Sequence, residues 1–193
     1  MPKNEVFNRD VVVQNAMNLF WQKGYGDTSM QDLVDVTGLG RSSIYNSFGS
    51  KMELYRIALD RYNAQSGQHF EKAMQSGKDP LDIIRTFFQL NLNEAMADQQ
   101  KRGCMIVNCK TEMAQKDGHL MNWLLKNQEQ TIAVFENLIE EAQKEGYANT
   151  NQSPTAYAHY LYNSLQGLRV SAITVSQRGI LQDIVDNTFK LLQ

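Results

Sequence analysis

The chain has 193 residues, 42% of them hydrophobic, and a formal net charge of −2. This hydrophobic fraction excludes a disordered chain and allows a sizeable core, and the slight negative charge argues against a protein that coats nucleic acid through bulk charge. Only three prolines interrupt long stretches of helix-forming residues, which predicts an all-α protein with few breakers.

The start of the chain and its two cysteines bear on the cellular compartment in which the protein is expected. The first residues lack the apolar segment of a signal peptide, and the longest apolar runs are only a few residues long. Cys104 and Cys109 are too few to make a disulfide scaffold. We therefore expect a soluble, cytoplasmic protein that makes no contact with a membrane.

A first helix is predicted from about Arg9 until Gly24 ends it. Asn8 can cap its start, because an Asn side chain accepts hydrogen bonds from first-turn N–H groups. Its apolar residues recur at the spacing of one buried face: Val12, Ala16, Leu19 and Phe20.

A second, shorter helix is predicted to begin after a cap at Thr28 or Ser29 and to stop at Gly38. A turn that ends at Gly40 separates it from a third helix, which starts at Arg41. The apolar face of the second helix contains Met30, Leu33 and Val34. Residues 1–50 are thus expected to form a three-helix unit.

The third predicted helix has an unusual outer face. Ile44 and Phe48 are four residues apart, so both point toward the core. The remaining faces hold weak helix formers: Ser42, Ser43, Tyr45, Asn46 and Ser47. Two helices joined by a tight glycine turn, the second rich in outward polar groups, indicate a helix-turn-helix whose second helix enters the major groove of DNA. A solvated connector is the other interpretation.

The residue types on this face suit DNA. Arg41 suits guanine or phosphate, Asn46 suits adenine, and serine and tyrosine suit phosphate or base edges. Ser50 can cap a fourth helix, which brings backbone N–H groups and the Lys51 ammonium near one phosphate.

Residues 9 to about 60 resemble the DNA-binding domain of the tetracycline-repressor (TetR) family of bacterial transcriptional regulators. The resemblance is carried by a phenylalanine, then KGY, followed by TSMQDLVDVTGLGRSSIYNSFGSKMELY. Two departures stand out. Gly40 occupies a position where the family often has a small hydroxyl residue that caps the recognition helix. Asn46 and Ser47 replace a frequent histidine or tyrosine pair, which leaves the operator sequence open.

The resemblance implies a homodimer that binds a palindromic operator in double-stranded DNA and releases it when a small molecule occupies the second domain. Ile44, Phe48, Leu33 and Phe20 look like support for the DNA-binding face. Carried over by position, the DNA-contacting candidates are Thr28, Ser29, Arg41, Ser42, Ser43, Tyr45, Asn46 and Lys51.

Residues 51–193 are expected to form a second, helical domain for ligand binding and dimerisation. A long helix runs from residue 50 to about 74, and Asp79 and Pro80 start another that reaches about residue 97. Gly103 opens a short helix containing both cysteines, and further helices cover about 119–145 and 154–177. Gly179 then precedes a last helix that ends near residue 192.

The final two predicted helices carry apolar stripes. An ordinary helical core explains some of these residues, whereas the resemblance implies that the two helices pair with those of a second copy in a four-helix bundle. The dimerisation candidates are Leu161, Leu165, Leu168, Ala172, Ile184 and Leu191.

The effector and its pocket are not fixed by any motif. Nine methionines in the chain suit an adaptable apolar cavity, although each candidate fills an ordinary core equally well. The ligand-binding candidates are Phe70, Phe87, Phe88, Met96, Met105, Met113, Met121, Trp123 and Phe135.

A thiol-based signal is the alternative. Cys104 and Cys109 face different ways on a helix, with Cα atoms about 8–9 Å apart, beyond the reach of a disulfide. A helix start at Gly103 and the neighbouring Lys101 and Arg102 favour a thiolate at Cys104, which allows redox or electrophile sensing. Free cysteine more often fills a core.

No catalytic residue, metal site or cofactor is expected. His69, His119 and His159 are scattered without metal-ligand spacing, and no phosphate loop or nucleophile elbow occurs. An enzyme is therefore the rival class that these absences argue against. A helical adaptor that binds only protein is the third class, but it does not need the outward polar set of residues 41–47.

Overall fold

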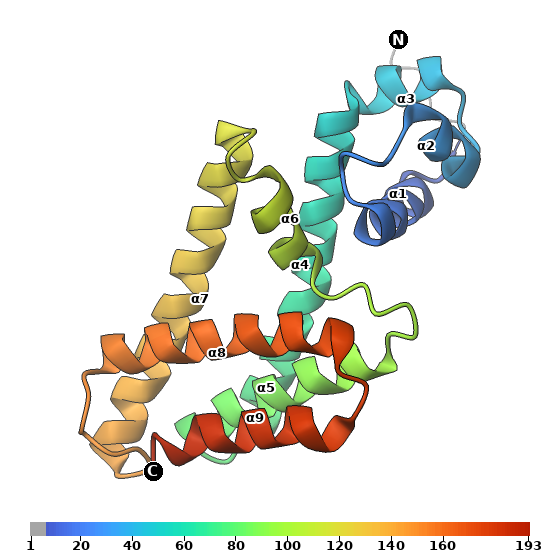
Figure 1. The fold of residues 1–193 in the computed structure, drawn as a ribbon. Coiled ribbons are helices and arrows are strands. Elements are labelled where there is room, and N and C mark those ends of the chain that lie inside the picture. Colours follow the sequence, from blue (N-terminus) through green and yellow to red (C-terminus); the bar gives the residue numbers. More distant parts are fainter. Residues whose placement is uncertain (1–6) are drawn as a thin grey trace.

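The computed structural model describes residues 7–193, and this part of the chain forms nine α-helices and no strand (Figure 1). The predicted all-α class is confirmed. Residues 1–6 of the predicted N-terminal domain lie outside the described residues. The helices are α1 Arg9–Lys23, α2 Met30–Thr37, α3 Arg41–Phe48, α4 Lys51–Ser76, α5 Pro80–Ala97, α6 Met105–Met113, α7 Gly118–Glu145, α8 Pro154–Thr174 and α9 Arg178–Lys190.

Local sequence signals set the ends of the first helices. The Asn8 side chain accepts hydrogen bonds from the first-turn N–H groups of α1, and Gly24, with φ 80°, ends that helix. Gly38 ends α2 in the left-handed region, with φ 70°, where glycine carries no Cβ penalty. Ser50 caps α4, as predicted.

Two hydrophobic cores divide the molecule. The N-terminal core combines α1–α3 with the first half of α4, all of α6 and the start of α7; Phe20, Ile44, Leu59 and Met113 are among its buried residues. The C-terminal core is built from the last turns of α4, most of α5 and α7, and α8 and α9.

Helix α4 therefore belongs to both cores, and α6 fills the core beneath α1–α3. Figure 1 shows α1–α3 gathered at one end of α4, with α8 and α9 at its other end and α6 between α4 and α7. Any movement of α6 acts directly on the packing of the helix-turn-helix unit, because buried side chains are close-packed. The boundary predicted at residue 50 stays a prediction.

Two helix boundaries differ from the predictions. Cys104 is extended and precedes α6, so only Cys109 lies within that helix. Helix α8 ends at Thr174 and α9 begins at Arg178, which places Gly179 inside α9. The run Ile173, Thr174 and Val175 is β-branched, and such residues lose rotamer freedom in a helix, which favours the earlier stop.

Candidate nucleic-acid interface and internal cavity

The entry to α2 is fixed by a reciprocal cap. The Ser29 hydroxyl accepts from the Asp32 N–H at 3.1 Å, and the Asp32 carboxylate accepts from the Ser29 N–H at 2.8 Å. Lys23 lies 2.9 Å from the same carboxylate. The hydrogen bond from Lys23, followed by those from Ser29, lowers the pKa of Asp32 to about 2. The cap holds exposed Ser29 at the edge of the helix-turn-helix.

Helix α3 presents the polar face that its sequence predicts. Ile44 is fully buried and Phe48 is 5% exposed, so they anchor the helix, whereas Tyr45 is 46% exposed. Within residues 7–193, the outward side chains make no intramolecular hydrogen bond or ion pair. These exposed side chains are Arg41, Ser42, Ser43, Tyr45 and Asn46. They are available for base edges and phosphates.

The start of α3 carries no side-chain cap. Gly40 is the N-cap residue, is exposed, and offers no side chain to the first-turn N–H groups. Those N–H groups point outward at the positive end of the helix dipole, an arrangement that suits an anion such as phosphate.

The end of α3 is tied to the start of α1. The guanidinium of Arg9 donates to the Ser47 carbonyl at 3.1 Å and lies 4.5 Å from the centroid of the Phe48 ring. Arg9 therefore sets the direction of α3. The sequence pattern missed this role because the two residues in the hydrogen bond are 38 positions apart.

Two predicted DNA contacts look different in the structure. Thr28 is fully buried and donates its hydroxyl to the Gly24 carbonyl at 2.6 Å, so its prediction as a surface contact is wrong. The cause is that the cap falls on Ser29, which turns Thr28 inward. Lys51 is half-buried, with its ammonium 4.3 Å from the centroid of the Tyr25 ring. Burial lowers the pKa of Lys51, and its phosphate contact stays a prediction.

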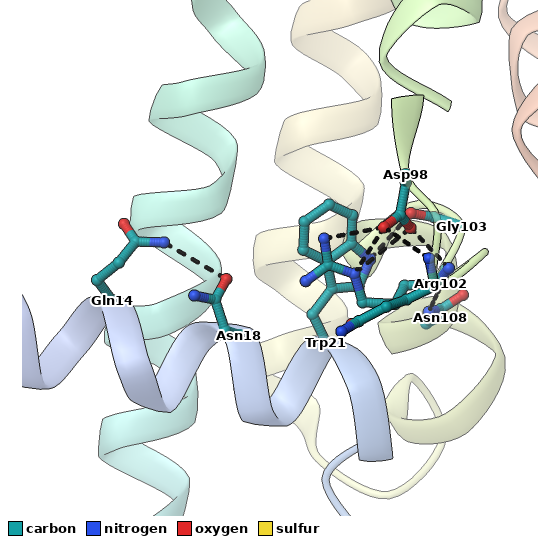
Figure 2. A network of polar contacts seen from close by, with 8 residues as sticks. Gln14, Asn18, Trp21, Asp98, Arg102, Gly103 and Asn108 are labelled. Atoms are coloured by element: carbon teal, nitrogen blue, oxygen red, sulfur yellow. Dashed lines mark hydrogen bonds and ion pairs between the residues drawn. The ribbon is translucent and has the colours of Figure 1, made fainter. Parts of the chain in front are cut away.

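The segment between α5 and α6 docks on α1 around Trp21 (Figure 2). The Trp21 indole N–H donates to the Gly103 carbonyl at 2.9 Å, and the Arg102 guanidinium lies 3.7 Å from the indole ring centroid. Asp98 accepts from the Arg102 backbone at 2.8 Å, and Asn108 donates to the Arg102 carbonyl. Burial alone raises the pKa of Asp98, but the hydrogen bonds from Arg102 outweigh burial and lower it.

Gly103 is confined between two helices. Its φ is 71°, and a Cβ built there lies 2.8 Å from the Ile173 side chain of α8. The same residue accepts the Trp21 hydrogen bond from α1. A single backbone position thus lies between α1 of the helix-turn-helix unit and the end of α8.

A second joint lies at the other end of α6. The Glu112 carboxylate accepts the backbone N–H groups of Tyr25 at 3.0 Å and Gly26 at 2.6 Å, just after α1. The Arg56 guanidinium donates to both carboxylate oxygens of Asp117 at 3.1 Å. Helix α6 is therefore bonded to the α1–α2 connection as well as packed beneath it.

A cavity of about 180 Å³, partly open to solvent, lies between α4, α5, α6, α7 and α8. Phe70, Phe87 and Phe135, three of the predicted ligand residues, line it. Polar groups contribute the rest of the wall together with a few apolar ones, and Ile106 brings α6 to the cavity. The polar lining residues are Asn63, Ser66, Asn127, Gln130, Thr131, Tyr162, Gln166 and Arg169.

Six predicted ligand residues lie outside this cavity, and their ligand-binding role stays a prediction. Phe88 packs against Phe189 in the C-terminal core, and Met105 and Met113 are buried in the N-terminal core. The other three are Met96, Met121 and Trp123. Met96 packs on the C-terminal core, Met121 is 40% exposed, and the Trp123 indole donates to Asp60 at 2.8 Å. Residue type suggested a cavity, but helix rotation decides which side chains reach it.

Both cysteines are buried thiols. Cys104 is 4% exposed and Cys109 is fully buried. Burial, the largest effect, raises the pKa of the Cys109 thiol. Arg102, expected to favour a thiolate at Cys104, instead lies over Trp21 and bonds Asp98.

Four predicted dimer residues face the chain's own interior. They are Leu161, Leu165, Leu168 and Ala172, each at most 3% exposed in the C-terminal core. They cannot contact a second chain in this arrangement, so that part of the prediction is wrong. A stripe at helical spacing predicts a buried face, but it does not tell an internal core from a partner.

The outer faces of α8 and α9 are also apolar in part. Val170 is 50% exposed, Ile180 47% and Leu191 53%, whereas Ile184 is half-buried against the C-terminal core. Leu191 thus keeps the outward position that a dimer contact needs. The dimer role of Ile184 and Leu191 stays a prediction.

Neither a metal site nor a membrane span was found in the part of the chain that the structure describes. No group of three or more His, Cys, Asp or Glu residues there could hold a metal ion. No helix within residues 7–193 combines the length and apolarity needed to cross a bilayer.

Two family models match the chain. The model for bacterial regulatory proteins of the tetR family matches residues 12–57, and the model for the tetracyclin repressor-like C-terminal domain matches residues 80–183. The repressor ComR of Escherichia coli K12 is 28% identical over 97% of this chain and 90% of its own length. The uncharacterized regulator YezE of Bacillus subtilis 168 is 26% identical over the whole of both chains.

Solved structures share the fold. A cysteine mutant of the TetR family regulator CifR, complexed with 26bp double-strand operator DNA, superposes with a TM-score of 0.86 at 22% identity, covering 99% of this chain and 100% of that one. Reduced Escherichia coli NemR gives a TM-score of 0.84 at 20% identity over 96% of each chain.

Proposed function

This chain belongs to the tetR family of bacterial regulatory proteins. We propose that it is a repressor whose homodimer binds a palindromic operator. A small molecule that fills the cavity makes the homodimer release the operator. The observation that carries the proposal is the outer face of α3, where Arg41, Tyr45 and Asn46 project from a buried Ile44–Phe48 anchor without intramolecular partners among the described residues. Repression, rather than activation, is supported by the name of the relative ComR.

The dimer is supported by the apolar outer faces of α8 and α9. Val170, Ile180 and Leu191 are each about half exposed. In a two-fold dimer built through these helices, the two α3 helices enter successive major grooves about 34 Å apart. A palindromic operator follows from that symmetry.

A route from cavity to DNA is supported by the position of α6. Ile106 lines the cavity, and the same helix packs in the N-terminal core. At its two ends, Gly103 accepts the Trp21 hydrogen bond and Glu112 accepts those of Tyr25 and Gly26. A ligand that displaces α6 therefore changes the orientation of α1–α3 and the spacing of the two recognition helices.

The experiment is a gel shift with the DNA upstream of the protein's own gene, followed by selection of bound sequences from a random pool. Arg41→Ala and Asn46→Ala each relax the selected motif at one symmetric pair of positions, because a bidentate base contact discriminates by about 1–3 kcal/mol. Ser76→Ala, on the exposed end of α4, is the control that leaves the motif unchanged. A wild-type protein that binds no duplex DNA contradicts the proposal.

The thiol signal is separated from the cavity signal by Cys104→Ser. Cys104 is buried, and the Arg102 side chain lies over Trp21. Both observations favour a signal that acts through the cavity. We expect oxidants and electrophiles to leave operator binding unchanged in both wild type and variant. A thiol reacts only where the reagent can reach it, and Cys104 is buried. If an electrophile makes the wild-type protein release operator DNA but has no effect on the variant, the signal belongs to Cys104 instead.

A further inference from the structure

A half-buried cation beside the cavity has no carboxylate partner. The Arg169 guanidinium, which lines the cavity, donates to the Asn91 side-chain oxygen at 2.8 and 3.2 Å. Asn91 is a buried, neutral amide, 5% exposed. Among residues 7–193 no ion pair to Arg169 is formed. A cation withdrawn from water without an anion is costly, so this site favours a negative ligand.

A second cation meets the same wall with neutral partners. The Lys110 ammonium contacts the Gln128 side-chain oxygen at 3.1 Å and the hydroxyl of Tyr162, a lining residue. Burial, the largest effect, lowers the pKa of Lys110, and the positive charge of Arg169 acts in the same direction. An anion placed beside Arg169 and Tyr162 offsets the charge of Arg169 directly and lies near the ammonium of Lys110, which contacts Tyr162.

The cavity wall also carries three phenylalanine rings among neutral polar side chains, and it contains no acid. Of the described residues that line it, Arg169 is the only charged one. The rings of Phe70 and Phe87 are 5.8 Å apart, and those of Phe87 and Phe135 are 6.0 Å apart, both edge to face. Such an arrangement accepts one more ring in an edge or offset contact.

One polar atom of the cavity wall has no hydrogen-bond partner among the described residues. The side-chain oxygen of Gln166 is buried and has no hydrogen-bond partner within the described residues. Gln166 lines the cavity one helical turn from Tyr162 and next to Arg169 on α8. A donor such as a ring hydroxyl satisfies this oxygen.

We propose that the effector is a single-ring aromatic carboxylate, with its carboxylate at Arg169 and Tyr162 and its ring against Phe70, Phe87 and Phe135. This inference rests on the proposed function, since it names the ligand class of the same cavity. The size agrees, because about 180 Å³ is smaller than the ~300–1,000 Å³ clefts that hold drug-sized ligands. A neutral ring leaves both cations unpaired, and a cationic one is repelled by them.

The experiment is calorimetric titration of the full-length protein with benzoate and its three monohydroxy isomers, and with the matching neutral benzamides. We expect at least one carboxylate to bind at least about tenfold more tightly than its amide, since a charge-assisted bond to Arg169 is lost in the amide. Equal affinity of carboxylate and amide, or no binding by any carboxylate, overturns the proposal.

Variants assign the binding to this wall. Arg169→Gln weakens carboxylate binding at least about tenfold, with little effect on the amide, and Arg169→Lys recovers part of the loss because the charge remains. Arg178→Gln is the matched control: Arg178 also donates to an asparagine of α5, Asn93, but at the exposed surface away from the cavity. Circular dichroism checks that each variant is folded. Unchanged carboxylate affinity in folded Arg169→Gln overturns the proposal.

The failures of the two proposals are distinguishable. If carboxylates bind and depend on Arg169 but the protein holds no operator DNA, the repressor function fails and the ligand class stands. If operator DNA is bound but no carboxylate binds, only the ligand class fails.

Discussion

The outer face of α3 and the α8 wall of the cavity both carry polar groups that lack either a charged partner or any hydrogen-bond partner, but only the α3 face is fully in water. Arg41 and Asn46 are exposed, so water satisfies them at no energetic cost. Arg169 has only a neutral partner and the Gln166 oxygen has none, and both lie at a cavity wall. An unpaired group is thus much stronger evidence for a ligand when it is buried. The α3 face needs the family match to be interpreted, whereas the cavity wall indicates its ligand by its own chemistry.

The largest expected effect comes from comparing a buried with an exposed apolar residue of α8 and α9. Leu161 is fully buried and Leu191 is 53% exposed. Leu161→Glu places an unpaired carboxylate in the C-terminal core and prevents folding, a loss of more than about 4 kcal/mol. Leu191→Glu keeps the fold, measured by circular dichroism, but yields monomers in light scattering. Folded Leu161→Glu protein contradicts the inward orientation.

The next test uses two neighbouring residues of α3, one buried and one exposed. Ile44→Ala costs about 2–4 kcal/mol of unfolding free energy because it leaves a cavity in the N-terminal core. Tyr45→Ala changes that free energy by less than about 0.5 kcal/mol but lowers operator affinity and flattens its salt dependence. Urea unfolding and salt-dependent gel shifts measure the two effects. Operator affinity that is unchanged in Tyr45→Ala removes this residue from the DNA face.

A third, smaller effect compares the half-buried Arg169 with the exposed Arg41. Arg169→Met leaves the buried Asn91 oxygen unpaired and costs about 1–3 kcal/mol of unfolding free energy. The double variant Arg169→Met with Asn91→Leu recovers most of that loss, because both polar partners are gone. Arg41→Met, on the exposed face, changes stability by less than about 0.5 kcal/mol. Chemical unfolding of wild type, Arg169→Met, Asn91→Leu and the double variant gives the cycle, and additive single effects contradict the pairing.

The smallest effect is a pH dependence at the α2 cap. The pKa of Asp32 is lowered from 3.8 to about 2 by Lys23 and Ser29, so its carboxylate stabilises the fold above about pH 4. That contribution is lost as pH falls toward 2. Asp32→Asn keeps the shape of the side chain, so its thermal unfolding midpoint is slightly below that of wild type at pH 7 and equal to it near pH 2. A difference that persists at pH 2 points to another cause.

Local features could be predicted from the sequence. The caps at Asn8, Ser50 and Asp79, and the glycine stops, are set by neighbouring residues, and the structure has them where the pattern predicts. The Ile44–Phe48 anchor and the polar face of α3 follow from helical spacing alone. These elements depend on contacts within a few positions of the chain.

Features that depend on helix rotation could not be predicted. Phe87 lines the cavity and its neighbour Phe88 does not, although the two residues have the same type and helix. The joints formed by Trp21 with Gly103 and by Glu112 with Tyr25 join residues more than 80 positions apart. A single sequence carries no signal for such pairs, because either partner alone has an ordinary local role.

The position of Trp21 also gives the protein an optical reporter. Only two tryptophans occur in the chain, and the indole of Trp123 donates to Asp60 of α4, whereas that of Trp21 donates to Gly103 of the α5–α6 segment. In a Trp123→Phe variant, all indole emission comes from the ring that lies under Arg102 and donates to Gly103. Its wavelength and quenching then follow the separation of α1 from the α5–α6 segment in real time. The movement of the DNA-binding helices that we propose on effector binding can thus be timed in a stopped-flow trace, without a label.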